Sequence, residues 1–412
     1  MSASPLRSVA EHQQHVAALL ATPHGSADAW PTETVPVAEA RDRVLGQAVT
    51  APEPLPSFDN SAMDGYAVRA AEVAGASAAS PVRLPVGEDI PAGAATGELA
   101  VGTARRIMTG APVPRGADAV VEVEVTDGGT ESVEVREARE AGTFVRRQGS
   151  DLAVGQEVLA AGTLLGPAPL GVLTALGIRE VVVRRRPRVL VCSTGSELAD
   201  DPVPGSGQIR DANGALLAAA VEEAGGVAVR QLWVADDVPA FLALLDEQLA
   251  GGDVDLVLTS GGVSAGAYEV VKEGLGPRGV EFTKVAMQPG MPQGSGLVGG
   301  VPVVCLPGNP VSALTSWEVF VRPGLRRAFG HPVPDRSVVR ARLTEPVQGL
   351  PAKRQIRRAR LDRATGEVTP WGPPGSGFLG WFAGADALID LPAGGAPLAV
   401  GEAVDAWDLL SR

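Results

Sequence analysis

The chain has 412 residues, of which 45% are hydrophobic, and its formal net charge at pH 7 is −13. This length exceeds what one hydrophobic core usually holds, so we expect about two to four domains. Nucleic acid and anionic membranes gain nothing from a net-negative surface, and the charge therefore argues against both as main partners.

The ends and the rare residues of the chain narrow the class of protein further. Residues 1–20 lack the basic region and continuous apolar core of a signal peptide, and a cytoplasmic location is expected. Cys192 and Cys305 lie inside apolar runs and are expected to be small buried hydrophobes. The histidines stand only at positions 12, 15, 24 and 331, so any catalytic metal would be a hard cation on carboxylate oxygens.

The first part of the chain indicates a helical arm that holds an inserted β domain. Helical periodicity over Ser8–Leu20 and Val37–Val49 predicts two amphipathic helices. Short alternating strands follow from about Val82 to Val158, and a short helix around Ala168–Ala175 returns to the arm. We therefore assign residues 1–56 and 146–186 to the arm and residues 57–145 to the inserted β domain.

Strands and helices alternate from Val189 onward, which predicts a three-layer α/β domain with a parallel sheet over residues 187–330. The predicted strands are Val189–Ser193, Val227–Val234, Val254–Thr259, Glu281–Met287 and Pro302–Leu306, and the predicted helices are Gly214–Ala224, Val238–Leu249, Tyr268–Gly274 and Pro310–Phe329. After Pro332 the apolar period returns to two, which predicts a compact C-terminal β domain over residues 331–412.

Two strands of the α/β domain run into glycine loops that precede helices. One loop is Thr259-Ser260-Gly261-Gly262-Val263-Ser264 and the other is Leu306-Pro307-Gly308-Asn309-Pro310-Val311-Ser312. Backbone N–H groups of such loops can close on an anion that also sits at the positive end of the following helix. Each loop alone is also typical of an ordinary strand-to-helix turn, but two loops from one sheet suggest a phosphate-bearing ligand.

A third loop, which contains Thr194, Gly195 and Glu197, leaves the first strand of the same sheet. Asp236 and Glu269 follow other strands of this domain. Several carboxylates near phosphate-binding loops would repel an anion unless a divalent cation bridges them, so the combination implies Mg²⁺ or a close analogue. The alternative for each acid alone is a helix-start charge that the helix dipole favours.

Five segments together resemble signatures of the molybdopterin molybdenumtransferase family, known as MoeA in bacteria and as the E domain of gephyrin in animals. In chain order they are Ser61–Ala67, Arg106–Pro112, Ser193–Leu198, Thr259–Gly266 and Leu306–Ser312. The resemblance implies a homodimer of elongated four-domain subunits whose α/β domain has the molybdopterin-binding fold. It further implies that molybdate and adenylylated molybdopterin are the substrates, that AMP and molybdenum cofactor are released with help from Mg²⁺, and that an upstream adenylyltransferase is a candidate docking partner.

The motif match also assigns roles to residues. It implies that Asp64 and Thr109 reach the cleft from the arm and β domain of the partner subunit. It gives Glu197, Asp236 and Glu269 as catalytic and metal-binding acids, with Lys284 as a cation near the phosphate or molybdate. The implied binding residues are Thr194, Gly195, Ser260, Gly261, Gly262, Ser264, Pro307, Gly308, Asn309, Pro310, Ser312 and Ser376, and Asp151 matches a further cleft position.

The chain departs from the family pattern at four positions. Glu269 is usually Asp, Gln288 often Lys, Met291 usually Lys and Ser295 often aromatic. Loss of the ammonium at Met291 removes a flexible cation from a site where a dianion should bind. Met291 and Gln288 therefore leave open a pterin-binding or scaffolding paralogue with little catalysis. A second alternative, an adenylyltransferase that makes the upstream intermediate, rests on the α/β domain alone.

Overall fold

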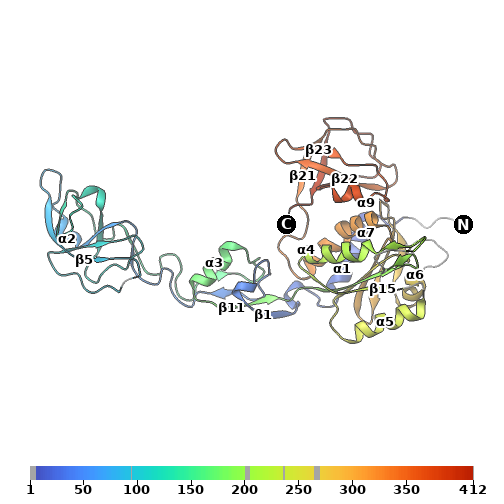
Figure 1. Ribbon diagram of the computed structural model, residues 1–412, viewed down its shortest axis with the longest axis horizontal. Helices are drawn as coiled ribbons and strands as arrows, with labels where there is room; N and C mark the ends of the chain where they lie inside the picture. Colours follow the sequence, from blue (N-terminus) through green and yellow to red (C-terminus); the bar gives the residue numbers. More distant parts are fainter. Residues whose placement is uncertain (1–5, 94, 200–204, 235–236, 264–269, 412) are drawn as a thin grey trace.

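The computed structural model describes residues 6–93, 95–199, 205–234, 237–263 and 270–411. The molecule is elongated, with the inserted β domain at one end, a narrow arm in the middle, and the α/β and C-terminal β domains at the other end (Figure 1). Within these residues, every helix is too short or too polar to cross a bilayer.

The α/β domain is built on a six-stranded sheet with the order β15-β12-β16-β20-β19-β17. Its strands are β12 Arg188–Thr194, β15 Val227–Val234, β16 Leu256–Ser260, β17 Glu281–Lys284, β19 Pro292–Val298 and β20 Val301–Leu306. The first four strands in this order are parallel, whereas β19 and β17 are antiparallel to their neighbours. The prediction of a wholly parallel sheet was therefore wrong at this edge.

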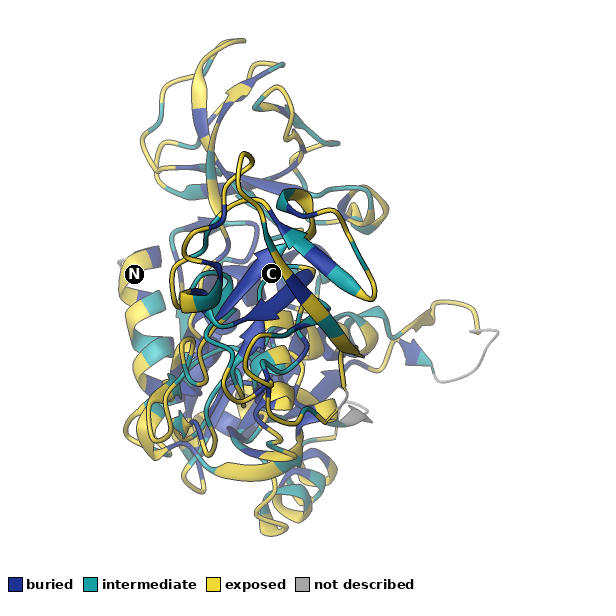
Figure 2. Cartoon of the chain, turned by 90° about the vertical axis from the view of Figure 1, so that its left-hand side faces the viewer, coloured by how far each residue is buried: buried dark blue, intermediate teal, exposed yellow. Residues whose placement is uncertain are grey.

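Helices cover both faces of this sheet, which confirms the three-layer architecture. One face carries α4 Ala212–Glu223, α7 Pro310–Ser316, a π-helical turn Trp317–Val321 and α8 Arg322–Ala328, and the other carries α5 Val238–Ala250 and α6 Val270–Leu275. Alternate residues of β12 serve the two cores: Val189 and Val191 face the first layer, and Leu190 and Cys192 face the second. Figure 2 shows the buried strands within a shell of exposed helices and loops.

Both cysteines are buried in the second core as free thiols, as predicted. Burial raises the pKa of Cys192 and of Cys305 to about 12, because the low-dielectric core disfavours a thiolate. Neither thiol is therefore a nucleophile at neutral pH.

Strand β19 was missed because its sequence, Pro-Gln-Gly-Ser-Gly-Leu-Val, is rich in residues that are rare in strands. Close packing explains the glycines. A Cβ atom at Gly296 would lie 2.4 Å from the Gly279 carbonyl oxygen. The predicted strand Glu281–Met287 also divides: after β17, residues Met287–Gln288 form β18, which pairs with a strand of the C-terminal domain.

The C-terminal domain is a small barrel. Its strands are β21 Val338–Leu343, β22 Arg354–Asp362, β23 Glu367–Pro370, β24 Ala387–Leu391 and β25 Ala403–Asp408, and its helix is α9 Leu379–Ala383. Pairing of β22 with both β23 and β24 closes the sheet around one apolar core.

The inserted β domain is a five-stranded sheet in the order β7-β4-β6-β5-β8. The strands are β4 Gly65–Val68, β5 Val82–Ile90, β6 Ala104–Ile107, β7 Ala119–Glu122 and β8 Ser132–Val135, with the short helix α2 Ala70–Val73 and a strand pair β3 Asn60–Ser61 and β9 Val145–Arg146 beside them.

The arm differs from the helical arm that we predicted. Its described residues form the strand pairs β1 Thr32–Pro36 with β11 Glu180–Arg184 and β2 Val49–Thr50 with β10 Glu157–Leu159, together with α3 Pro167–Ala175.

Helix α1, Val9–Ala21, packs on α8 of the α/β domain, because its apolar face (Val9, Val16, Leu19, Leu20) joins the core there. The domain boundaries themselves stay a prediction.

The helix predicted over Val37–Val49 was also wrong. Only Val37–Glu39 form a 3₁₀ turn, and the chain then makes backbone hydrogen bonds to the opposite side of the arm, from Leu45 N to Thr163 O and from Gly46 N to Val182 O. The apolar residues that suggested a helix are buried all the same, since Val37, Ala40 and Leu45 pack against α3 and β11. Tertiary pairing overrides the helical period here.

Candidate functional site

Three loops meet at one edge of the α/β sheet. Strands β12, β16 and β20 are adjacent and parallel, so their carboxyl ends reach the same rim. Gly261 makes the contact between the loops: its φ of +100° is a conformation that favours glycine, and a Cβ atom there would lie 2.5 Å from the Thr194 carbonyl oxygen. A Cβ atom at Gly308 would lie 3.2 Å from the Cα of Gly261. Backbone from all three loops therefore converges.

Asn213 ties two of these loops together, the one after β16 and the one after β20. Its Nδ2 donates to Ser260 Oγ at 2.6 Å and to the Gly308 carbonyl at 2.7 Å. Asp211 positions it, because the Asp211 carboxylate caps α4 by accepting a hydrogen bond from Gly214 N at 3.0 Å. Among the described residues, Asn213 Oδ1 is buried and has no hydrogen-bond partner. A buried acceptor is costly when unpaired, so this oxygen fits a donor from a ligand.

The loop after β20 leads into a capped helix. Asn309 caps α7 by accepting a hydrogen bond from Val311 N at 3.2 Å, and Pro310 occupies the first turn, where its missing N–H leaves no bond unmade. Pro307 and Gly308 precede the cap, and Ser260 Oγ lies 3.5 Å from the Pro307 carbonyl oxygen. Ser312 is buried within α7.

Glu197 and Lys284 lie at the same rim. The Glu197 carboxylate folds over Gly195, where a Cβ atom would lie 2.3 Å from Glu197 Oε2, and the side chain is otherwise exposed. Lys284 ends β17 opposite Pro292 of β19, and the antiparallel register carries this end to the carboxyl edge of β20. Its side chain is exposed. Ser264, Asp236 and Glu269 lie outside the described residues.

A small hollow adjoins the first turns of α7. Val311 and Thr315 line it from α7, and Arg357, Arg358 and Gly375 line it from the C-terminal barrel. Arg358 donates to the Gly375 carbonyl at 3.0 Å, which places the loop with half-buried Ser376 here. Burial lowers the pKa of both arginines, and the hollow has no carboxylate in its lining.

These two arginines, like Asn213, were missed in the sequence. Arg357 and Arg358 lie in a stretch for which the sequence predicted only a strand of the C-terminal β domain. Consecutive arginines in a strand point to opposite faces, so one of them had to face inward, and that was the available signal. For Asn213, the signal was a polar side chain two residues after a capping aspartate.

Asp64 and Thr109 form a second constellation in the inserted β domain. The antiparallel pairing of β4 with β6 brings them together, and Asp64 Oδ1 accepts hydrogen bonds from Thr109 N at 2.6 Å and from Thr109 Oγ1 at 2.8 Å. The backbone bond first and the hydroxyl bond second lower the pKa of Asp64. Both side chains are exposed. This domain lies at the far end of the molecule from the glycine loops, so one chain does not unite the two constellations (Figure 1).

Comparison with known proteins agrees with this architecture along the whole chain. Three family models match: the MoeA N-terminal region (domain I and II) over residues 7–177, a probable molybdopterin binding domain over 190–327, and the MoeA C-terminal region (domain IV) over 340–409. Molybdopterin molybdenumtransferase 2 of Mycobacterium tuberculosis is 52% identical over 98% of this chain and 100% of its own length. The chain belongs to the molybdopterin molybdenumtransferase family.

More distant members of the molybdopterin molybdenumtransferase family align nearly as completely. The enzyme of that name from Staphylococcus aureus is 33% identical over 91% of this chain and 90% of its own length. A solved structure of the molybdopterin biosynthesis MoeA protein from Pyrococcus horikosii is 31% identical, covers 99% of this chain and 100% of its own, and superimposes with a TM-score of 0.81. The resemblance predicted from five short segments is thus confirmed, as is the multidomain fold.

The structure describes only one of the three predicted metal ligands. Within the part of the chain that the structure describes, no three His, Cys, Asp or Glu side chains lie close enough together to hold a metal ion. Two of the three predicted ligands, Asp236 and Glu269, fall outside that part. The magnesium site therefore stays a prediction, and Glu197 is its described member.

Proposed function

We propose that this protein inserts molybdenum from molybdate into adenylylated molybdopterin and releases AMP and molybdenum cofactor. The observation that carries the proposal is the convergence of three loops, two of them held together by Asn213, on one rim of the α/β domain. The full-length similarity to molybdopterin molybdenumtransferase 2 supports this choice among the activities that an α/β domain of this type can host.

In this proposal the chain's own groups bind and neutralise the anionic substrates. Backbone N–H groups of the three loops receive phosphate oxygens, with Lys284 as a cation at the same rim. Arg357 and Arg358 beside the hollow would supply cations for the oxyanion molybdate, since no carboxylate lines the hollow with them. These arginines compensate for the ammonium that Met291 lacks, which favours catalysis over a binding paralogue.

Glu197 fits as one ligand of a magnesium ion, because its carboxylate is exposed at the rim and supplies hard oxygen donors. Asp236 and Glu269 would be the other two ligands. When bound, magnesium would neutralise charge that develops on the phosphoanhydride oxygens. Its removal by EDTA is expected to abolish AMP release, and added Mg²⁺ is expected to restore it.

We also propose that the active unit is a homodimer. Asp64 is exposed and held in one orientation by Thr109, and its lowered pKa keeps it ionised, yet the glycine loops of its own chain are at the other end of the molecule. A two-fold dimer of elongated subunits brings each β domain to the partner's α/β domain. Asp64 would then orient the attacking group at the phosphoanhydride.

One assay on the purified protein tests the function. We expect AMP release from adenylylated molybdopterin that depends on molybdate and Mg²⁺, and loss of this turnover in Asp64→Ala and Glu197→Ala. Glu345→Ala removes an exposed carboxylate of the C-terminal barrel and serves as the matched control. Tight pterin binding without AMP release would identify the protein as a binding paralogue, and consumption of ATP would identify it as an adenylyltransferase.

A further inference from the structure

A second cleft lies between the α/β domain and the C-terminal barrel. It has a volume of about 280 Å³ and shares no lining residue with the hollow beside α7. Helix α1, the π-helical turn, α8 and the strands β21, β22, β24 and β25 all contribute to its wall. Nothing in the proposed reaction uses this cleft.

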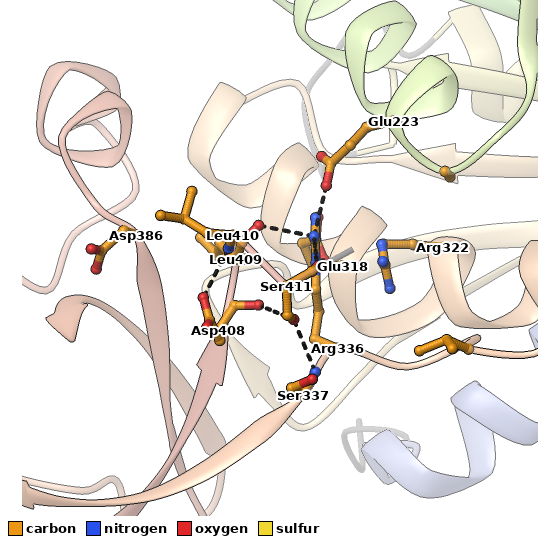
Figure 3. Close-up of polar contacts among 12 residues, drawn as sticks. Glu223, Glu318, Arg322, Arg336, Ser337, Asp386, Asp408, Leu409, Leu410 and Ser411 are labelled. Atoms are coloured by element: carbon orange, nitrogen blue, oxygen red, sulfur yellow. Dashed lines mark hydrogen bonds and ion pairs between the residues drawn. The ribbon is translucent and has the colours of Figure 1, made fainter. Parts of the chain in front are cut away.

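Most charges that line the cleft are paired. Arg336 is buried between Glu318 and Glu223, with nitrogen-to-oxygen distances of 2.9 Å and 2.6 Å, and Figure 3 shows this cluster with the chain end from Asp408 to Ser411 folded against it. The three aspartates of the lining have arginine partners as well: Asp390 with Arg354, Asp405 with Arg340, and Asp335 with Arg327. Every carboxylate of the lining is thus compensated.

Arg322 is the exception. It is 2% exposed and lines the cleft, and its Nη1 donates to the Pro334 carbonyl at 3.0 Å. Its Nε is buried without a hydrogen-bond partner, and no carboxylate of the described residues lies within ion-pair distance. Figure 3 shows Arg322 beside Arg336 with no dashed line to it. Burial, and then the charge of Arg336, lower the pKa of Arg322, and the more distant carboxylates of Glu318, Glu223 and Asp335 offset this only in part.

We infer that this cleft binds a small oxyanion, a molecule with a carboxylate or phosphate group, and that Arg322 is its receptor. A buried guanidinium without a direct ion pair and with an unpaired N–H is unfavourable, and an oxyanion would supply both a contact ion pair and an acceptor for Nε. The cleft is larger than a phosphate ion, so the natural ligand carries further atoms, for which Val319 and Trp407 offer apolar contact. Because the wall comes from two domains, the ligand joins them.

Thermal unfolding of the full chain tests the inference. Sodium phosphate and sodium succinate, each compared with sodium chloride at equal ionic strength, separate the two kinds of oxyanion. We expect at least one of them to raise the melting temperature by about 2 °C, because a ligand that binds only the folded state stabilises it. Arg322→Met should lose this rise. Arg342→Met, which removes an exposed arginine of β21 that does not line the cleft, should keep it.

The inference is wrong if neither anion raises the melting temperature of the native protein, or if Arg322→Met responds as the native protein does. Should Arg322→Met fail to fold, native crystals soaked in sodium selenate decide. Anomalous selenium density between Arg322 and Trp407 supports the inference, and density only elsewhere overturns it.

Discussion

A single side-chain amide organises the rim of the α/β sheet. Asn213 holds Ser260 Oγ and the Gly308 carbonyl at once, so two loops from neighbouring strands depend on one residue. Such a link pre-orders backbone donors before the substrate arrives, which reduces the entropy that binding must overcome. Asp211, as the cap of α4, fixes the amide in turn.

We predict that Asn213→Ala weakens substrate binding more than it weakens the fold. Loss of two hydrogen bonds should cost about 1–2 kcal/mol in the free energy of unfolding. The freed loops should raise the KM for adenylylated molybdopterin by about tenfold or more. Urea unfolding and steady-state kinetics measure the two effects. Equal KM values in variant and native protein would contradict the role given to Asn213.

At Asp64 the prediction concerns a pKa. Hydrogen bonds from Thr109 hold the folded pKa below the ordinary value of 3.8, so the contact stabilises the fold fully above that value and loses its effect as the pH falls through the folded pKa. Thr109→Val removes the hydroxyl but keeps the backbone N–H, so the pKa of Asp64 should rise only part of the way toward 3.8. Thr109→Ser should leave it low. NMR titration of the carboxyl carbon measures both, and an unchanged pKa in Thr109→Val would contradict the contact.

Helix α1 shows how a helix at the start of the chain is stabilised and packed against a domain. A capping box begins it, since Ser8 and Glu11 exchange hydrogen bonds with each other's backbone. Its His12 is fully buried, packs edge-on against Phe320 with ring centroids 4.7 Å apart, and has no hydrogen-bond partner among the described residues on either ring nitrogen. Burial first, and the charges of Arg7 and His15 next, lower the pKa of His12 to about 3.

This burial predicts a pH-dependent stability. Between the folded pKa near 3 and the ordinary value of 6.5, the unfolded state binds the extra proton, so stability falls as the pH falls. Each such group contributes about 1.4 kcal/mol per pH unit in this window. His331, whose pKa burial lowers to about 4, adds to it. His12→Leu should therefore make the free energy of unfolding less dependent on pH between 4 and 6.5, without loss at pH 7. Denaturant unfolding across this range measures it, and an unaltered slope would exclude His12 as a source.

Sequence periodicity predicted the secondary structure correctly where an element is buried on one regular face. It failed where contacts with segments distant in the sequence determine the local conformation. The alternation after Val189 predicted the α/β layers, and a helix begins at Pro310 as expected. Residues 37–49 have the apolar spacing of a helix, but the same apolar residues are buried in an irregular segment that pairs with the other side of the arm. Strand β19 was missed because it contains glycines, which are rare in strands and are explained here only by close packing against neighbouring residues. Asn213, Arg357 and Arg358 were missed for a similar reason, since their importance depends on neighbours far away in sequence.

The shape of the whole molecule separates two parts of the candidate site. Asp64 and Thr109 belong to the β domain at one end, and the loops held by Asn213 belong to the α/β domain at the other end (Figure 1). In a two-fold dimer each complete site would take its β domain from one subunit and its glycine loops from the other. Variants in the two parts should therefore complement each other.

We predict that a mixture of Asp64→Ala and Glu197→Ala proteins, unfolded and refolded together, regains AMP release that neither has alone. In a mixed dimer one site combines both substitutions and the other has none, so random pairing should restore about a quarter of the native rate. A mixture of two variants on the same side, Glu197→Ala and Asp236→Ala, is the control and should stay inactive, since every site then takes its proposed metal ligands from a damaged chain. Failure of the first mixture to regain activity, when size-exclusion chromatography shows that the dimers have re-formed, would place the complete site within one subunit and refute the shared site.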